Sequence, residues 1–102
     1  MIENTIPDEQ EKTYEEHCKE DAGKTYYYEV DDIPVMVVND PTGHLEYRFG
    51  WKDGKWEPEY PSYDMFYNEG SKMSKERFAS WMKNTFKVDI ETNKPTLPPQ
   101  NA

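Results

Sequence analysis

Between residues 25 and 56, large apolar residues recur at every second position. This period is typical of β-strands with one buried face, because successive side chains point to opposite sides of a strand. Residues 33–38 are apolar at nearly every position, which indicates a central strand covered on both faces. The clearest alternation has one face made of Leu45, Tyr47, Phe49 and Trp51.

Two turn signals divide this region. Residues 39–43, with the sequence NDPTG, favour a tight turn, because proline presets one backbone angle and Gly43 accepts a left-handed conformation. Asp53 and Gly54 predict a two-residue hairpin that places Trp51 opposite Trp56. Residues 25–57 are therefore predicted to form an antiparallel meander of three or four strands.

A helical period appears on either side of the predicted meander. Residues 7–22 predict an acidic N-terminal helix with Pro7 in its first turn, Gly23 after its end and only a thin apolar stripe. Ser71 or Ser74 caps a second helix ending near Phe86. Within residues 74–86, one arc of a helical wheel collects Phe78, Ala79, Trp81, Met82, Thr85 and Phe86. Residues 88–90 are predicted to add a short edge strand.

Together these patterns predict a two-layer α+β fold. The meander carries the amphipathic C-terminal helix on one face, and the acidic N-terminal helix lies at an edge or on that same face. Residues 1–90 form a single small domain, and residues 91–102 form a proline-rich mobile tail. The predicted core is Tyr28, Val30, Val35, Val37, Leu45, Tyr47, Phe49, Trp51, Phe78, Trp81, Met82 and Phe86.

Composition alone argues against folding, and the aromatic content argues for it. The 102 residues include only 15 Leu, Ile, Val and Phe and carry a net charge of −9, as disordered chains often do. Three Trp, eight Tyr and four Phe, however, can each bury a large area, so we expect a modest aromatic core. Cys18 is the single cysteine, so a disulfide framework is excluded and a cytoplasmic location is expected. No apolar run is long enough for a membrane span, and no signal peptide is apparent.

The charge is unevenly distributed. Residues 1–23 and 24–70 each carry a net −6, whereas residues 71–102 carry +3. Direct binding to a nucleic-acid backbone is disfavoured, because it requires a basic surface. The basic C-terminal region is expected to be a solvated helix face, with contact to an anionic partner as the alternative.

The sequence contains no catalytic, metal-binding or cofactor-binding motif. His17 and Cys18 are adjacent on a helix and point about 100° apart, so they do not converge on one metal ion. His44 with Asp40 is better explained as a hydrogen-bonded turn than as an acid–base pair. Glycine-rich phosphate loops and calcium loops are absent. We therefore predict that the protein is not an enzyme.

The tyrosine-rich connection at residues 57–70 is the most informative segment. Tyrosine and tryptophan are common in protein interfaces, since they offer a large, stiff area with a polar end. One interpretation is that these aromatics fold back to complete the core, and the other is that they form an exposed binding surface. The candidate partner-binding residues are Trp56, Tyr60, Tyr63, Asp64, Phe66 and Tyr67.

We expect a non-enzymatic interaction protein that binds a basic protein partner, in an inhibitor, immunity-type or adaptor role. One alternative is a nucleic-acid mimic that blocks a DNA-binding enzyme, although its carboxylates would need to form a continuous stripe. A second alternative is a structural component that self-associates through an open sheet edge as a homo-oligomer.

Overall fold

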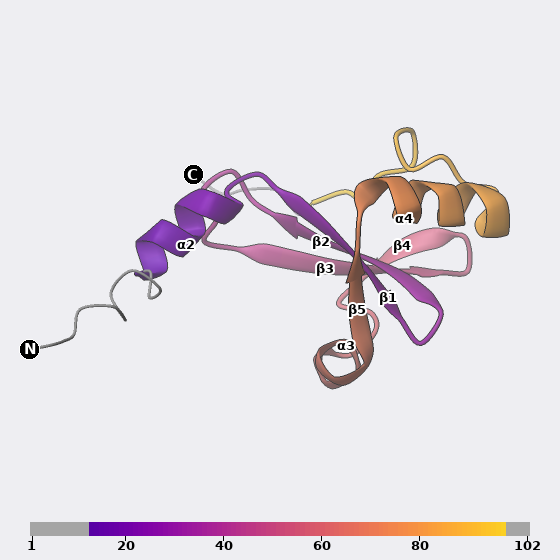
Figure 1. Cartoon of the computed structure of the whole chain (residues 1–102), viewed down its shortest axis with the longest axis horizontal. Helices are drawn as coiled ribbons and strands as arrows, with labels where there is room; N and C mark the ends of the chain where they lie inside the picture. Colours follow the sequence, from indigo (N-terminus) through magenta and orange to yellow (C-terminus); the bar gives the residue numbers. More distant parts are fainter. Residues whose placement is uncertain (1–12, 98–102) are drawn as a thin grey trace, which may run out of the picture.

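The computed structural model describes residues 13–97, which form a mixed α+β fold built on one antiparallel sheet of five strands (Figure 1). The α+β class is confirmed, but the prediction of three or four strands is wrong. The strand order across the sheet is β4-β3-β2-β1-β5. In chain order the elements are α2 (Tyr14–Asp21), β1 (Thr25–Val30), β2 (Ile33–Asn39), β3 (Glu46–Lys52), β4 (Lys55–Pro58), α3 (Tyr63–Glu69), β5 (Gly70–Met73), α4 (Lys75–Trp81) and the π-helical turn η1 (Met82–Phe86).

The hairpin turns have the chemistry that tight turns require. Asp53 and Gly54 take φ angles of 53° and 81° between β3 and β4, as a two-residue hairpin demands. This turn pairs Trp51 with Trp56, and the two rings meet edge to face with centroids 4.9 Å apart. Asp31 and Asp32 likewise adopt positive φ angles in the β1–β2 turn.

The fifth strand was not predicted. β5 pairs antiparallel with β1 at the edge opposite β4, with Met73 beside Tyr27. Its four residues, GSKM, have neither β-branched side chains nor apolar alternation, so their strand conformation depends on the neighbouring β1 and not on a local preference.

Both faces of the sheet are covered, so the two-layer prediction is also wrong. On one face, here called the α4 face, Met36 packs with Phe78, Met82 and Ile90. On the other, the α3 face, the buried cluster is Val30, Val35 and Val37, and the partly buried Met65 and Phe66 of α3 pack against it. Figure 1 shows α4 and α3 on opposite sides of the strands.

The predicted core therefore mixes residues from two separate clusters. Val30, Val35, Val37, Phe49, Phe78 and Met82 are buried, but the first three do not share a cluster with the helix residues. The other predicted core residues are half-buried, except that Leu45 is 50% exposed and does not belong to the core. Leu45 precedes β3, in the loop after β2, and belongs to neither of the two described clusters.

The predicted C-terminal helix at residues 74–86 is two elements. Ser74 caps α4 by accepting a hydrogen bond from the Arg77 amide, and the chain passes into η1 after Trp81. The left-handed Lys87 (φ 62°) then ends the helical segment. Residues 88–90 form no strand, and Ile90 is buried against the α4 face instead.

The N-terminal helix sits at the far end of the sheet (Figure 1). Within the described residues it runs from Tyr14, and the predicted residues 7–12 lie outside them. A capping box joins Thr13 and Glu16. The Glu16 amide donates to the Thr13 hydroxyl at 3.1 Å, and the Thr13 amide donates to the Glu16 carboxylate at 2.8 Å. The radius of gyration, 16.3 Å, exceeds the roughly 13 Å expected for a compact chain of this length.

Candidate binding surface on the α3 face

The connection between β4 and α3 is held against β3 by backbone contacts. The Glu59 amide donates to the Arg48 carbonyl at 2.7 Å, and Arg48 Nε donates to the Pro61 carbonyl at 2.8 Å. Gly50 permits the close approach, because a Cβ atom there would overlap the carbonyl oxygen of Tyr60. Pro61 is fully buried. The start of α3 is therefore fixed to the rigid sheet.

Arg48 also joins the sheet to the aromatic side chains of α3. Its guanidinium carbon lies 5.8 Å from the ring centre of Tyr63 and 5.7 Å from that of Phe66. The Phe66 ring meets Tyr28 edge to face at 4.9 Å. Burial raises the pKa of Tyr28, and the nearby Glu46 adds to this shift. Phe66 thus anchors α3 in the core cluster of this face.

The outer side of α3 carries two exposed aromatic rings. Ser62 caps the helix by accepting a hydrogen bond from the Met65 amide. Tyr63 and Tyr67 are one helical turn apart and are 60% and 74% exposed. Their rings stack with centroids 5.9 Å apart. We call these two side chains the tyrosine pair.

The structure brings together five of the six predicted partner-binding residues and separates the sixth. Tyr63, Asp64 and Tyr67 are exposed on α3, while Phe66 turns inward. Tyr60 precedes α3 in the chain and is half-buried. Lys52 Nζ lies 5.0 Å from the centre of the Tyr60 ring.

Trp56 lies on the α4 face instead. Its ring stacks on Phe78 at 6.3 Å, and its Nε1 donates to the carbonyl of Asn93 at 2.6 Å. The sequence held the signal for this placement, since Trp56 is paired with Trp51 and directly paired residues share a face of the sheet.

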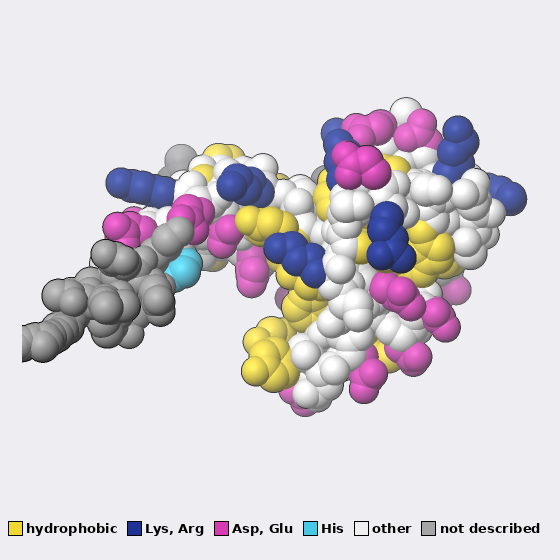
Figure 2. All heavy atoms as spheres, in the orientation of Figure 1, with side chains coloured by type: hydrophobic (Ala, Val, Ile, Leu, Met, Phe, Trp, Pro, Cys, Tyr) yellow, Lys and Arg dark blue, Asp and Glu magenta, His cyan; other side chains and the backbone are white. Residues whose placement is uncertain are grey.

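Exposed carboxylates lie on α3 and in the turn between β1 and β2. Asp64 and Glu69 are exposed on α3 itself, and Asp31 and Asp32 are exposed in the β1–β2 turn. In Figure 2 acidic side chains follow the lower right border of the molecule, on the side where Figure 1 places the β1–β2 turn. The upper right border, over α4, carries Lys and Arg side chains with Asp and Glu side chains between them.

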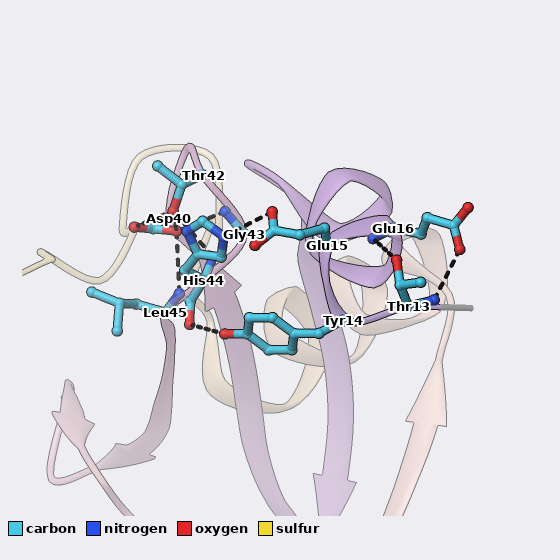
Figure 3. A network of polar contacts seen from close by, with 9 residues as sticks. All are labelled: Thr13, Tyr14, Glu15, Glu16, Asp40, Thr42, Gly43, His44 and Leu45. Atoms are coloured by element: carbon cyan, nitrogen blue, oxygen red, sulfur yellow. Dashed lines mark hydrogen bonds and ion pairs between the residues drawn. The ribbon is translucent and has the colours of Figure 1, made fainter. Parts of the chain in front are cut away.

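A second polar site joins α2 to the β2–β3 loop (Figure 3). The Asp40 carboxylate accepts hydrogen bonds from the Thr42 hydroxyl and from the amides of Gly43 and Leu45. Burial alone would raise the pKa of Asp40, but these hydrogen bonds together lower it. Asp40 is thus satisfied by its own turn.

His44 contacts α2 instead of Asp40. Its Nε2 lies 3.3 Å from a carboxylate oxygen of Glu15, and its ring stacks on Tyr14 with centroids 5.8 Å apart. These contacts attach α2 to the β2–β3 loop. Within the described residues, Glu15 is the one acidic or basic side chain that they bring to the His44 ring.

A cavity of about 540 Å³ lies on the α4 face under residues 90–97. Its apolar lining includes Tyr27, Met36, Val38, Ile90 and Leu97. The segment above it is tied to α4 by an ion pair of 2.9 Å between Lys75 and Glu91. This pair raises the pKa of Lys75 and lowers that of Glu91, mainly through their mutual hydrogen bond.

Within residues 13–97, no group of three or more His, Cys, Asp and Glu side chains is placed to hold a metal ion. None of the helices described has the length and apolar character that a bilayer-spanning segment requires. Comparisons with protein-family models, with curated proteins and with solved structures found no match.

Proposed function

We propose that this protein acts by binding a partner protein that has a basic surface, and that the tyrosine pair is the centre of the contact. The observation that carries the proposal is that Tyr63 and Tyr67 are exposed and stacked on a helix that is itself fixed to the sheet. Neighbouring exposed aromatic side chains are frequent anchors in interfaces, because they offer a large, stiff contact area with a polar end. A preorganised surface also loses little conformational entropy on binding.

The charge distribution supports a basic partner. The net charge of −9 attracts positively charged surfaces over long range and raises their association rate. Asp64 and Glu69 are exposed on the same helix as the tyrosine pair, and their carboxylates can pair with lysine and arginine at the rim of the contact. We therefore propose an inhibitor, immunity-type or adaptor role with no chemical turnover.

A nucleic-acid mimic is less well supported. A mimic needs an unbroken row of carboxylates, whereas the tyrosine pair stands among the carboxylates of α3. The neighbouring strand β5 also carries Lys72, whose Nζ lies 4.1 Å from the ring centre of Tyr26. Displacement of the partner by DNA at the same site would favour the mimic.

The test compares matched tyrosine substitutions in binding to a partner captured from a lysate of the source organism. The double variant Y63S/Y67S is expected to weaken binding at least about tenfold, as interface anchors do. Tyr14→Ser is the control, because Tyr14 is 65% exposed but lies on α2 at the far end of the sheet.

Binding by the control should equal that of the unchanged protein, and Y63S/Y67S should keep the circular dichroism of the unchanged protein. Equal binding by Y63S/Y67S would remove the tyrosine pair from the interface. Binding that does not weaken as salt increases would contradict the basic partner.

A further inference from the structure

A small cavity opens beside the tyrosine pair on the α3 face. It has a volume of about 230 Å³ and is lined by Val37, Glu46, Arg48, Tyr63 and Phe66. Its wall is apolar on the sheet side, from Val37, and aromatic on the α3 side. Arg48 brings the positive charge to this cavity.

The guanidinium of Arg48 is held in one orientation but only partly used. Its Nε donates to the Pro61 carbonyl at 2.8 Å, and the rings of Tyr63 and Phe66 lie within 6 Å of its central carbon. Among residues 13–97, no side chain or carbonyl accepts a hydrogen bond from its two terminal amino groups. An arginine has five N–H donors, so four remain on the half-buried side chain.

A planar carboxylate matches this arrangement. The fork of an arginine binds a carboxylate through two parallel hydrogen bonds, and prior fixing of the fork reduces the entropy lost. The apolar wall of the cavity suits the methylene groups that carry such a carboxylate in a Glu or Asp side chain.

We propose that the cavity at Arg48 receives an acidic side chain, Glu or Asp, of the partner protein. This inference rests on the proposed function. The partner's basic surface provides the long-range attraction, and its one acidic side chain fixes the register of the contact. The surrounding surface is acidic, so Arg48 offers the complementary charge at this point and repulsion opposes misplaced docking.

Glu46 gives the proposal a directional test. Its carboxylate lines the same cavity and repels an incoming anion. Glu46→Gln should therefore strengthen carboxylate binding, while substitution of Arg48 should weaken it. A purely structural role of Arg48 predicts no gain from Glu46→Gln.

The experiment uses the full chain and a defined probe, the α-amide of N-acetylglutamic acid, followed through the NMR signal of the Arg48 Nε–H group and of backbone amides around the cavity. The neutral comparison is the α-amide of N-acetylglutamine. The charged probe should bind about tenfold more tightly than the neutral one, because hydrogen bonds to a charged acceptor are stronger. Arg48→Lys should weaken probe binding about fivefold or more, and Glu46→Gln should strengthen it about two- to threefold.

Glu76→Gln is the matched control, because it removes the same charge from α4 on the opposite side of the sheet, and it should leave probe affinity unchanged. Equal affinity for the two probes, or no gain from Glu46→Gln, would overturn the inference. Tighter binding of inorganic phosphate than of the glutamate probe would overturn the carboxylate assignment. None of these results involves the partner, so the proposed function stands or falls separately on Y63S/Y67S.

Discussion

Gly43 in the β2–β3 loop lies directly against the carbonyl group of Cys18 in α2. A Cβ atom at position 43 would overlap that carbonyl oxygen and stand 2.7 Å from the carbonyl carbon. Gly43 also has a φ of 79°, in the left-handed region that other residues rarely adopt. Cys18 is buried at this contact, although α2 exposes nearly all its other side chains. This close approach is one of the few contacts that hold α2, together with those of His44 and the 2.7 Å hydrogen bond that the Tyr26 hydroxyl of β1 donates to Asp21.

Gly43→Ala should therefore both destabilise the protein and loosen α2. We expect the free energy of unfolding to fall by about 2 kcal/mol, from backbone strain together with the overlap at Cys18. The Cys18 thiol should then react faster with Ellman's reagent. Gly54→Ala is the control, since Gly54 has a φ of 81° but no atom within 4 Å of the added Cβ. It should cost about 1 kcal/mol and leave Cys18 protected. Equal thiol reactivity in both variants would contradict the contact.

Phe66 and Tyr67 are neighbours with opposite roles. Phe66→Ala should lower the free energy of unfolding by about 2–3 kcal/mol, because its ring packs on Tyr28 and on the valine cluster of the α3 face. Tyr67→Ala should change it by less than about 0.5 kcal/mol, since the side chain is 74% exposed. Urea denaturation measures both values. A large loss in Tyr67→Ala would show that the ring supports the fold and is not free for a partner.

Met82 and Leu45 provide a similar contrast for the α4 face. Met82→Ala should cost about 3 kcal/mol, because the side chain is fully buried against Met36 and Phe78. Leu45→Ala should cost less than about 0.5 kcal/mol. The urea midpoints of the two variants are compared. A large loss only in Met82→Ala supports the packing in the structure, whereas the alternation in the sequence predicts a large loss in Leu45→Ala as well. Equal costs would contradict the placement of Leu45 outside it.

Asp40 should make stability depend on pH. Its pKa in the folded protein lies below the ordinary value of 3.8, so its contribution to stability is complete above that value and is lost as the pH falls through the lower folded value. Asp40→Asn should therefore be less stable than the unchanged protein at pH 7, with a smaller difference at pH 3. An unchanged profile in Asp40→Asn would refute this role.

The sequence was sufficient for the strands of the meander, since the alternation and turn residues of residues 25–58 are local signals. It did not predict which face of the sheet α4 covers. β2 is apolar on both sides, with Val35 and Val37 on one and Met36 and Val38 on the other, so periodicity alone could not say which set meets α4. β5 had no pattern of its own, because its pairing with β1 is a long-range contact.

The candidate site was predicted in part. Tyr63, Asp64 and Tyr67 are exposed together on α3, but the inward turn of Phe66 requires knowledge of what α3 packs against. Arg48 was missed as a site residue, because its role depends on the return of residues 59–66 across β3. The misplacement of Trp56 was avoidable, as its register with Trp51 was already predicted.

Only a few contacts of the described residues hold α2, to the β2–β3 loop and to Tyr26 of β1, so the molecule should have regions of unequal stability. The amides of α2 should exchange with solvent through a local opening that leaves the five strands intact, while the amides of β1 and β2 exchange only on complete unfolding. α2 would then unfold separately while the sheet, which is covered on both faces, stays folded. Hydrogen exchange would show this as two groups of amides with different protection.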